Sequence, residues 1–328
     1  MNSIKLKYLV FLLVFLKVSC NSTQTGCTDP LARNFDSTAT EDDNSCVYDT
    51  VYRSPDWSVE ISEQIGETSG LIIWDEHLWT INDNSDTRLY ALDTSSGEII
   101  TDFSLSGVVN RDWEEIAQDE DFIYVGDIGN NRGNRTDLHI LRIDKPSLLS
   151  GDPSIDTIWF SFSDQQNFDP AGAQQTEFDC EAFVISSDSI YLFTKQWLSG
   201  FTTQYSLSKL PGTYVAQKRT SFNTMGQVTG ATFMEQEGLL ILCGYAGLVQ
   251  PFLYLFYDYQ DYEFFSGVRQ RVNISLPFHQ VEGVTTSNGT GYYFSNESST
   301  FNQIAKLPPK LHYIDLSEFL GDYMNKGK

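Results

Sequence analysis

From Trp57 onward, apolar residues recur in short runs that are separated by Gly, Asp, Asn and Ser. Runs that are rich in β-branched and aromatic side chains and bounded by turn-forming residues are typical of β-strands. They lie at residues 71–74, 78–81, 89–92, 122–125, 140–143, 158–162, 190–193, 239–242, 252–256 and 291–294. A helical period appears at residues 315–323, in the C-terminal tail (315–328). The pattern therefore predicts an all-β fold of the sandwich, barrel or propeller type.

One short motif recurs five times in this stretch, at intervals of roughly 50 residues. Each copy has a polar or acidic residue followed by small and apolar ones, and then a second apolar strand that ends in polar residues. The equivalent polar positions are Ser69, Glu114, Glu181, Thr229 and Glu282. This period is typical of propeller blades, so we predict a β-propeller over residues 55–314.

Five motifs favour five blades. The longest interval, between Glu114 and Glu181, leaves room for a sixth blade around residues 155–162. Residues 57–61 precede the first motif, and we expect them to close the ring as an outer strand beside the last blade.

Charge narrows the classes of partner. The 328 residues include 21 Lys+Arg and 44 Asp+Glu, which gives a formal net charge of −23. This balance argues against nucleic acid and against a polybasic membrane patch, because both need clustered Lys and Arg. Aromatic residues make up 14% of the chain, which indicates a folded rather than a disordered acidic protein.

The N-terminus has the layout of a bacterial secretory signal peptide. Two lysines precede an apolar run at residues 9–16, which is too short to span a bilayer. Residues 1–19 are the predicted signal and residues 20–25 a tether. The small residue before Cys20 resembles the lipobox of bacterial lipoproteins, in which the Cys is lipidated, although Lys17 departs from that pattern. Ordinary cleavage without lipidation is the alternative.

The resemblance to lipoproteins implies an exported protein anchored to the outer membrane, on its periplasmic or cell-surface side. The lipid anchor would be its contact with the membrane, and we expect a monomer. An exported chain favours disulfides.

Residues 26–48 form a small, acidic segment bounded by Cys27 and Cys46, which are the natural disulfide pair. The segment resembles a short repeat of secreted Bacteroidetes proteins, of the form GCTDPxAxN followed by DDGSC. Its polar side chains are either Ca²⁺ ligands or solvated turn residues: Asp29, Asn34, Asp36, Asp42, Asp43 and Asn44. Cys180 and Cys243 lie in apolar surroundings and either pair with each other or remain buried thiols.

Several strings stand out along the chain: DWEEIA, YVGDIGNNRGNR, DCEAF with LFTK, VTGATF, and VEGVTT with FSNES. In this order they resemble a family of secreted bacterial propellers, whose members are often labelled uncharacterised or loosely phytase-like or esterase-like. The resemblance that they carry spans roughly residues 67–297. Cys180 and Asn131 depart from the family pattern. The resemblance implies a propeller fold and says little about activity.

The repeated polar residues should form a ring around the axis of a propeller. Glu114, Glu181 and Glu282 would repel one another without a cation, a proton or a basic partner. Oxygen ligands without His or Cys point to Ca²⁺ or Mg²⁺ rather than zinc, and Ca²⁺ is the cofactor we expect. The alternative is that they hydrogen-bond neighbouring blades. The ends of the second strands add further candidate ligand-binding residues: Asp83, Asp127, Lys195, Tyr245 and Glu297.

A second candidate site is the glycine-rich loop at residues 127–135. Asn130, Arg132 and Arg135 place donors near Asp127, and Arg can grip a carboxylate or phosphate through two parallel hydrogen bonds. The alternative is that the arginines pair with nearby acids and brace the loop.

Aromatic residues crowd residues 245–265, where they either stack on sugars or pack the blades.

The leading hypothesis is an exported, lipid-anchored binding or scaffold protein for a small-molecule, glycan or protein ligand. The alternative is a Ca²⁺-dependent hydrolase of the phosphoesterase type, in which the carboxylates hold metal and activate water.

Overall fold

The computed structural model describes residues 23–28, 32–43, 45–169, 172–301 and 305–326. The chain forms two compact units, Met1–Val47 and Tyr48–Lys328. The predicted signal peptide and Cys20 lie outside the described residues. Within the described residues, no helix has both the length and the apolar character needed to cross a membrane.

The first unit is held by the predicted disulfide between Cys27 and Cys46. Two short strands, β1 (Thr25–Gly26) and β2 (Glu41–Asp42), pair in parallel. The Asp36 carboxylate accepts hydrogen bonds from the backbone and hydroxyl of Thr38, and the Asn34 side chain bridges the backbone of Ser45 and Val47. These contacts support the turn interpretation for the two side chains; Asp29 and Asn44 lie outside the described residues.

The second unit confirms the all-β prediction. Its strands form five antiparallel groups of four, and consecutive strands of a group pair with one another in the first four groups. The first group is β5 (Thr68–Trp74), β6 (His77–Asn82), β7 (Arg88–Leu92) and β8 (Ile99–Ser104). The second group is β9 (Trp113–Gln118), β10 (Phe122–Asp127), β11 (His139–Asp144) and β12 (Ile155–Phe162). The third group is β13 (Asp179–Ile185), β14 (Ser189–Lys195), β15 (Phe201–Ser208) and β16 (Gly212–Asn223).

The remaining groups include strands from the start of the unit. The fourth group is β17 (Gln227–Met234), β18 (Leu239–Ala246), β19 (Gln250–Tyr257) and β20 (Val268–Ile274), and β3 (Val51–Arg53) pairs with β20 in parallel. The fifth group is β21 (Val281–Thr286), β22 (Gly291–Asn296), β25 (Lys310–Asp315) and β4 (Trp57–Glu60). The pairing of β4 with β25 places residues 57–60 where the sequence predicted them.

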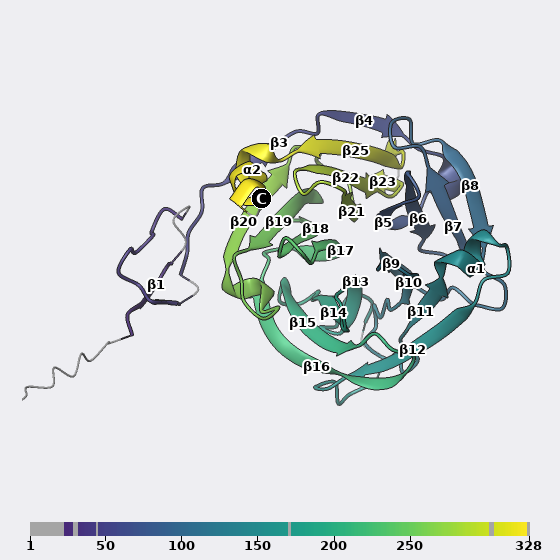
Figure 1. Ribbon diagram of the computed structural model, residues 1–328, viewed down its shortest axis with the longest axis horizontal. Helices are drawn as coiled ribbons and strands as arrows, with labels where there is room; N and C mark the ends of the chain where they lie inside the picture. Colours follow the sequence, from purple (N-terminus) through teal and green to yellow (C-terminus); the bar gives the residue numbers. More distant parts are fainter. Residues whose placement is uncertain (1–22, 29–31, 44, 170–171, 302–304, 327–328) are drawn as a thin grey trace, which may run out of the picture. The chain divides into compact units, whose positions relative to one another are not determined.

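The five groups follow one another around a common centre (Figure 1). The first strands β5, β9, β13, β17 and β21 lie innermost, each contacts the next, and β21 returns to contact β5. The outer strands β12 and β16 pair in parallel and join the second and third groups into one eight-stranded sheet. Residues 155–162, the possible site of a sixth blade, form the outer strand β12 of the second group.

Short elements complete the unit. They are η1 (Glu63–Ile65), α1 (Lys145–Leu149), η2 (Phe264–Ser266), the hairpin of β23 (Ser299–Phe301) and β24 (Ala305–Leu307), and α2 (Ser317–Lys326). The last of these matches the helical period seen in the sequence.

The core consists of apolar clusters between the faces of neighbouring groups. Phe252, Phe256, Phe264 and Phe265 are all buried and contact other rings, so this part of the aromatic stretch packs between sheets rather than facing solvent. Cys180 and Cys243 are both free and buried. They therefore behave as small core residues.

Candidate functional site

A pocket of about 290 Å³ opens where the inner strands begin and the second strands end. Seven predicted site residues converge on it from different groups. They are Asp83, Glu114, Glu181, Lys195, Tyr245, Glu282 and Glu297. Its other lining residues are Ser69, Asn131, Gln174, Trp197 and Gln280. The pocket thus brings together side chains that are far apart in sequence.

The pairing of the inner strands is irregular at each repeated polar residue, and all of these residues except Thr229 line the pocket. The pairing register of the inner strands skips one residue in four of the groups, and the skipped residues are Glu114, Glu181, Thr229 and Glu282. In the first group the register also shifts, directly after Ser69. A bulge leaves its extra residue unpaired and turns its side chain, which explains why the motif recurs at equivalent places.

The repeated residues then divide by chemistry. The hydroxyl of Ser69 donates to the carbonyl of Glu114, and that of Thr229 donates to the carbonyl of Val281, so both tie neighbouring groups together. Glu114, Glu181 and Glu282 instead line the pocket with their carboxylates. The hydroxyls therefore match the structural alternative, while the three glutamates line one shared pocket.

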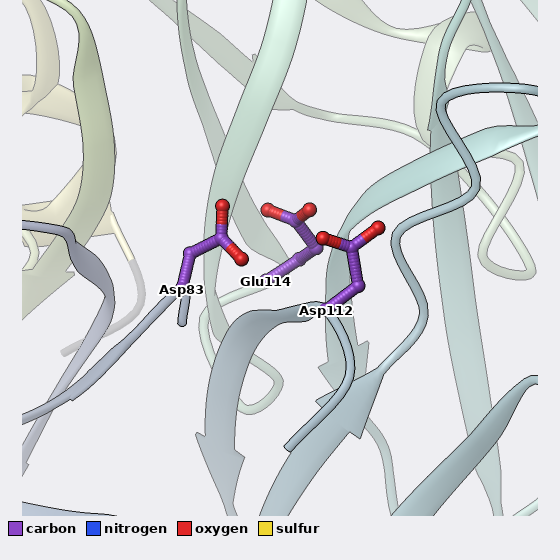
Figure 2. Close-up of side chains that lie close together, drawn as sticks. All are labelled: Asp83, Asp112 and Glu114. Carbon is purple, nitrogen blue, oxygen red and sulfur yellow. The ribbon is translucent and has the colours of Figure 1, made fainter. Parts of the chain in front are cut away.

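Three carboxylates form the tightest acidic cluster. One oxygen from each of Asp83, Asp112 and Glu114 lies within 4.8 Å of the others (Figure 2). Oxygens that share a Ca²⁺ ion at 2.3–2.6 Å are separated by about this distance or less. Asp112 was not predicted, although it precedes the first strand of the second group directly, as the first letter of DWEEIA.

Backbone approaches the cluster closely on one side. A Cβ atom on Gly129 would lie 2.3 Å from a carboxylate oxygen of Asp112 and 2.4 Å from one of Glu114. Any other residue here would push these two carboxylates out of place, and this is a physical reason for the second glycine of GDIGNN.

Glu181 has a cationic partner. Its carboxylate accepts a hydrogen bond from Lys195 Nζ at 2.9 Å, and both residues are almost fully buried. The same ammonium lies 4.6 Å from the ring centre of Trp197 and 5.4 Å from that of Tyr245. Burial is the largest single effect and would lower the pKa of Lys195, but the surrounding acidic groups, Glu181 first among them, together raise that pKa.

Glu282 is only partly satisfied. Its Oε1 accepts a long hydrogen bond from Gln280 Nε2, at 3.4 Å, and the same amide donates to Glu297 at 2.5 Å. Its Oε2 has no hydrogen-bond partner among the described residues, although the residue is only 6% exposed. A buried acceptor without a partner is costly, so this oxygen needs something that the protein itself does not supply.

Burial and mutual repulsion raise the pKa of every acid in the pocket. Burial raises the pKa of Asp83 to about 8, with further contributions from Asp112 and Glu282. Burial likewise raises the pKa of Glu297 to about 9, helped by Glu282 and Asp83. The pKa values of Glu114 and Glu282 are also raised, above all by burial. Without a cation, the pocket favours protonated carboxyls.

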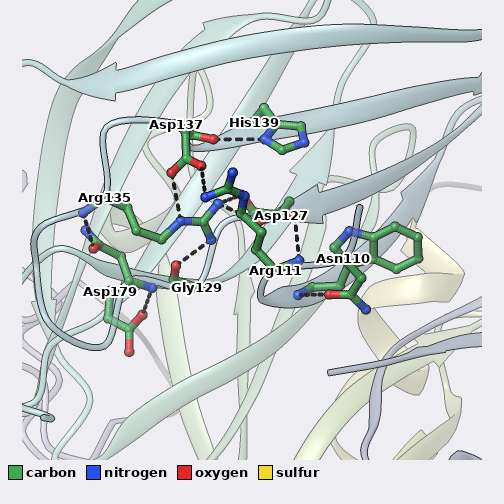
Figure 3. A network of polar contacts seen from close by, with 10 residues as sticks. Asn110, Arg111, Asp127, Gly129, Arg135, Asp137, His139 and Asp179 are labelled. Carbon is green, nitrogen blue, oxygen red and sulfur yellow. Dashed lines mark hydrogen bonds and ion pairs between the residues drawn. The ribbon is translucent and has the colours of Figure 1, made fainter. Parts of the chain in front are cut away.

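The polar side chains of the loop at residues 127–135 mainly contact other parts of the protein. Arg135 donates to the buried Asp127 carboxylate at 2.5 Å, to the Gly129 carbonyl at 2.8 Å and to Asp137 at 3.1 Å (Figure 3). Asn130 accepts from the Arg135 backbone N–H and donates to the Asp179 carboxylate through its own backbone. Arg132 is exposed to solvent. These contacts match the bracing alternative.

One acidic residue that sequence reasoning missed is Glu115. It is fully buried, and its two oxygens accept backbone hydrogen bonds from Ile116 at 3.0 Å and from Ala231 at 2.7 Å. The signal was present in DWEEIA, because alternation along a regular strand would place two adjacent glutamates on opposite sides.

No family model and no curated protein matches this sequence. Among solved structures, the chain is similar to the computationally designed Ika8 protein, at 10% identity over 73% of this chain and 58% of that one, with a TM-score of 0.30. It is also similar to Kuenenia stuttgartiensis hydrazine synthase, at 10% identity over 75% of this chain and 59% of that one, with a TM-score of 0.37. The chain thus spans less than two thirds of either structure, and likenesses this low carry no argument about its function.

Proposed function

We propose that this protein is an exported five-bladed β-propeller that binds calcium in its central pocket and holds a ligand through that ion. The five four-stranded groups around one centre, and the N-terminal strand β4 beside β25, support the blade assignment. The resemblance of its motifs to secreted bacterial propellers and the lipobox-like Cys20 support export and a lipid anchor.

The unpartnered Oε2 of Glu282 carries the calcium proposal. Glu282 lines the same pocket as Asp83 and Glu114 of the Asp83–Asp112–Glu114 cluster, and Glu297 also lines this pocket. Buried carboxylates are tolerated when a cation or a proton compensates them, and the donors here are oxygens alone. Asp83, Asp112, Glu114 and Glu282 are the candidate ligands, and Glu297 would complete the shell.

Binding is better supported than phosphoester hydrolysis. In a metal-dependent phosphoesterase, basic side chains commonly help the metal ion to hold the anion. Arg135 is committed to Asp127 and Asp137, and Lys195 is committed to Glu181. The calcium-dependent hydrolase therefore remains the weaker of the two candidates.

Thermal unfolding of the purified protein at pH 8, with millimolar Ca²⁺ or with EDTA, tests the proposal. Calcium at a hundredfold excess over its Kd should stabilise the protein by about 2.7 kcal/mol. Glu282→Gln should reduce this gain, while the same variant without metal should be more stable than the wild type, because it removes an uncompensated carboxylate.

Glu120→Gln is the matched control, since Glu120 is exposed on a turn away from the pocket. It should leave the calcium response unchanged. Equal melting temperatures in Ca²⁺ and EDTA would refute the calcium site. Steady turnover of a phosphate ester that Glu282→Gln abolishes would favour the hydrolase instead.

A further inference from the structure

We infer that the ligand held in the central pocket is a neutral sugar, bound through vicinal hydroxyls to the calcium ion and stacked on Trp197. This inference rests on the proposed function and names the chemical class of its ligand. It follows from the charge of the pocket, from the neutral polar groups that line it, and from the way Trp197 is fixed.

The charge of the pocket disfavours anionic ligands. Five carboxylates line it, and Asp112 adds a sixth beside them. When Ca²⁺ is bound and all six groups are ionised, the ion and the Lys195 ammonium together offset only half of their negative charge. The lining has no guanidinium, and its one ammonium is already paired with Glu181. A phosphate, sulfate or carboxylate would therefore meet net negative charge.

Neutral hydrogen-bonding groups complete the lining. Asn131, Gln174 and Gln280 bring side-chain amides, each with both a donor and an acceptor end, and Tyr245 brings a hydroxyl. Hydroxyl groups of a sugar also donate and accept. Two vicinal hydroxyls supply neutral oxygens, which are suitable ligands for a Ca²⁺ ion that already has several carboxylates.

Trp197 forms a fixed aromatic wall. Its indole N–H donates to the Asp179 carboxylate at 2.7 Å, and Asp179 also accepts from the backbone of Asn130. The ring is half-buried and lines the pocket. A ring held in one orientation loses little entropy on binding, and the apolar face of a sugar can stack on the ring face that the Lys195 ammonium does not cover.

The volume sets the size of the ligand. The pocket holds about 290 Å³, at the small end of the range for ligand sites, which is about 300–1,000 Å³. This space suits the terminal residue of a glycan rather than a long stretch of chain.

An array of neutral and anionic glycans, probed with the intact protein in Ca²⁺ and in EDTA, tests the inference. We expect the protein to bind neutral glycans when Ca²⁺ is present and not when EDTA has removed it. The strongest neutral glycan is then titrated against variants by calorimetry. Trp197→Ala should weaken glycan binding about tenfold and leave the calcium midpoint within about twofold. Trp197→Phe keeps the ring and should lose much less.

Trp159→Ala is the matched control, because Trp159 lies on the outer strand β12, where its ring packs on His139. It should bind like the wild type.

Binding restricted to sulfated, sialylated or phosphorylated glycans, or no glycan binding by a protein that calcium still stabilises, would overturn the sugar inference alone. Loss of the calcium response itself would instead refute the proposed function. If Trp197→Phe binds as weakly as Trp197→Ala, the tryptophan acts through Asp179 and stacking is refuted.

Discussion

At the scale of the residue, one backbone irregularity separates the site glutamates from ordinary strand positions. Glu114, Glu181 and Glu282 are each skipped by the pairing register, so their carboxylates leave the usual alternation of a strand. Their neighbours return to the regular pattern and pack in the core. The same five-residue motif therefore serves both the core and the pocket.

His312 is a buried ionisable group whose hydrogen-bond partners are supplied by the protein itself, in contrast to Glu282. It is fully buried, with Ser58 Oγ at 2.7 Å from Nδ1 and Asn296 Oδ1 at 2.7 Å from Nε2. Both ring nitrogens are satisfied in the neutral form. Burial lowers the pKa of His312 to about 3, with smaller effects from His279 and Lys310.

The first prediction concerns acid stability. The unfolded chain takes up a proton at His312 near the ordinary histidine pKa of 6.5, and the folded chain only near 3, so this residue makes stability fall as pH decreases from about 6.5 towards 3. His312→Gln should lower the free energy of unfolding at pH 7. The difference between variant and wild type should shrink by up to about 1.4 kcal/mol per pH unit below 6.5. Urea midpoints at pH 7 and pH 4.5 measure it, and a constant difference would contradict it.

At the scale of the element, Glu115 links two inner strands that are not neighbours in the ring. It lies on β9, and its Oε2 accepts from Ala231 on β17, while β13 lies between them in the order of strands. On another side, a Cβ atom on Gly70, whose φ is +64°, would lie 2.5 Å from Glu115 Oε1. The glycine of TSGLI thus makes room for this carboxylate.

The second prediction concerns this link. Glu115→Ala leaves two buried backbone N–H groups without acceptors and should lower the free energy of unfolding by about 3 kcal/mol. Glu115→Gln retains one acceptor and should cost less. Urea denaturation followed by circular dichroism measures both effects. Glu120→Ala, on an exposed turn, is the control and should be close to neutral; an alanine variant at position 115 as stable as the wild type would show that the link contributes nothing.

At the scale of the whole molecule, the ring is closed by a strand from its own beginning. β4 pairs with β25 near the end of the chain, and the backbone N–H of Ile61 donates to the carbonyl of Pro309 at 3.0 Å. Closure of this kind ties the two ends of the second unit into one sheet and covers an edge strand.

The third prediction concerns closure. Ile61→Pro removes that N–H and should lower the free energy of unfolding of the whole second unit by about 3 kcal/mol. Ile61→Val keeps the hydrogen bond and should cost about 1 kcal/mol. Tryptophan fluorescence and far-UV circular dichroism should report one coincident urea transition for each variant. A proline variant with an unchanged midpoint would mean that closure is dispensable.

Periodicity by itself determined the all-β class, most strand positions and the closing strand, and the short spacing of Cys27 and Cys46 indicated the disulfide, because all of these depend on local patterns. It also singled out seven residues of the pocket, because repeated motifs occupy equivalent places. Only the tertiary structure decided that Asp112 joins Asp83 and Glu114, that Arg135 braces a loop, and that Trp197 is fixed by Asp179. Those outcomes depend on which side chains from distant strands meet and on the bulges that turn them. The repeat pattern of a single sequence shows neither the contacts between distant strands nor the bulges.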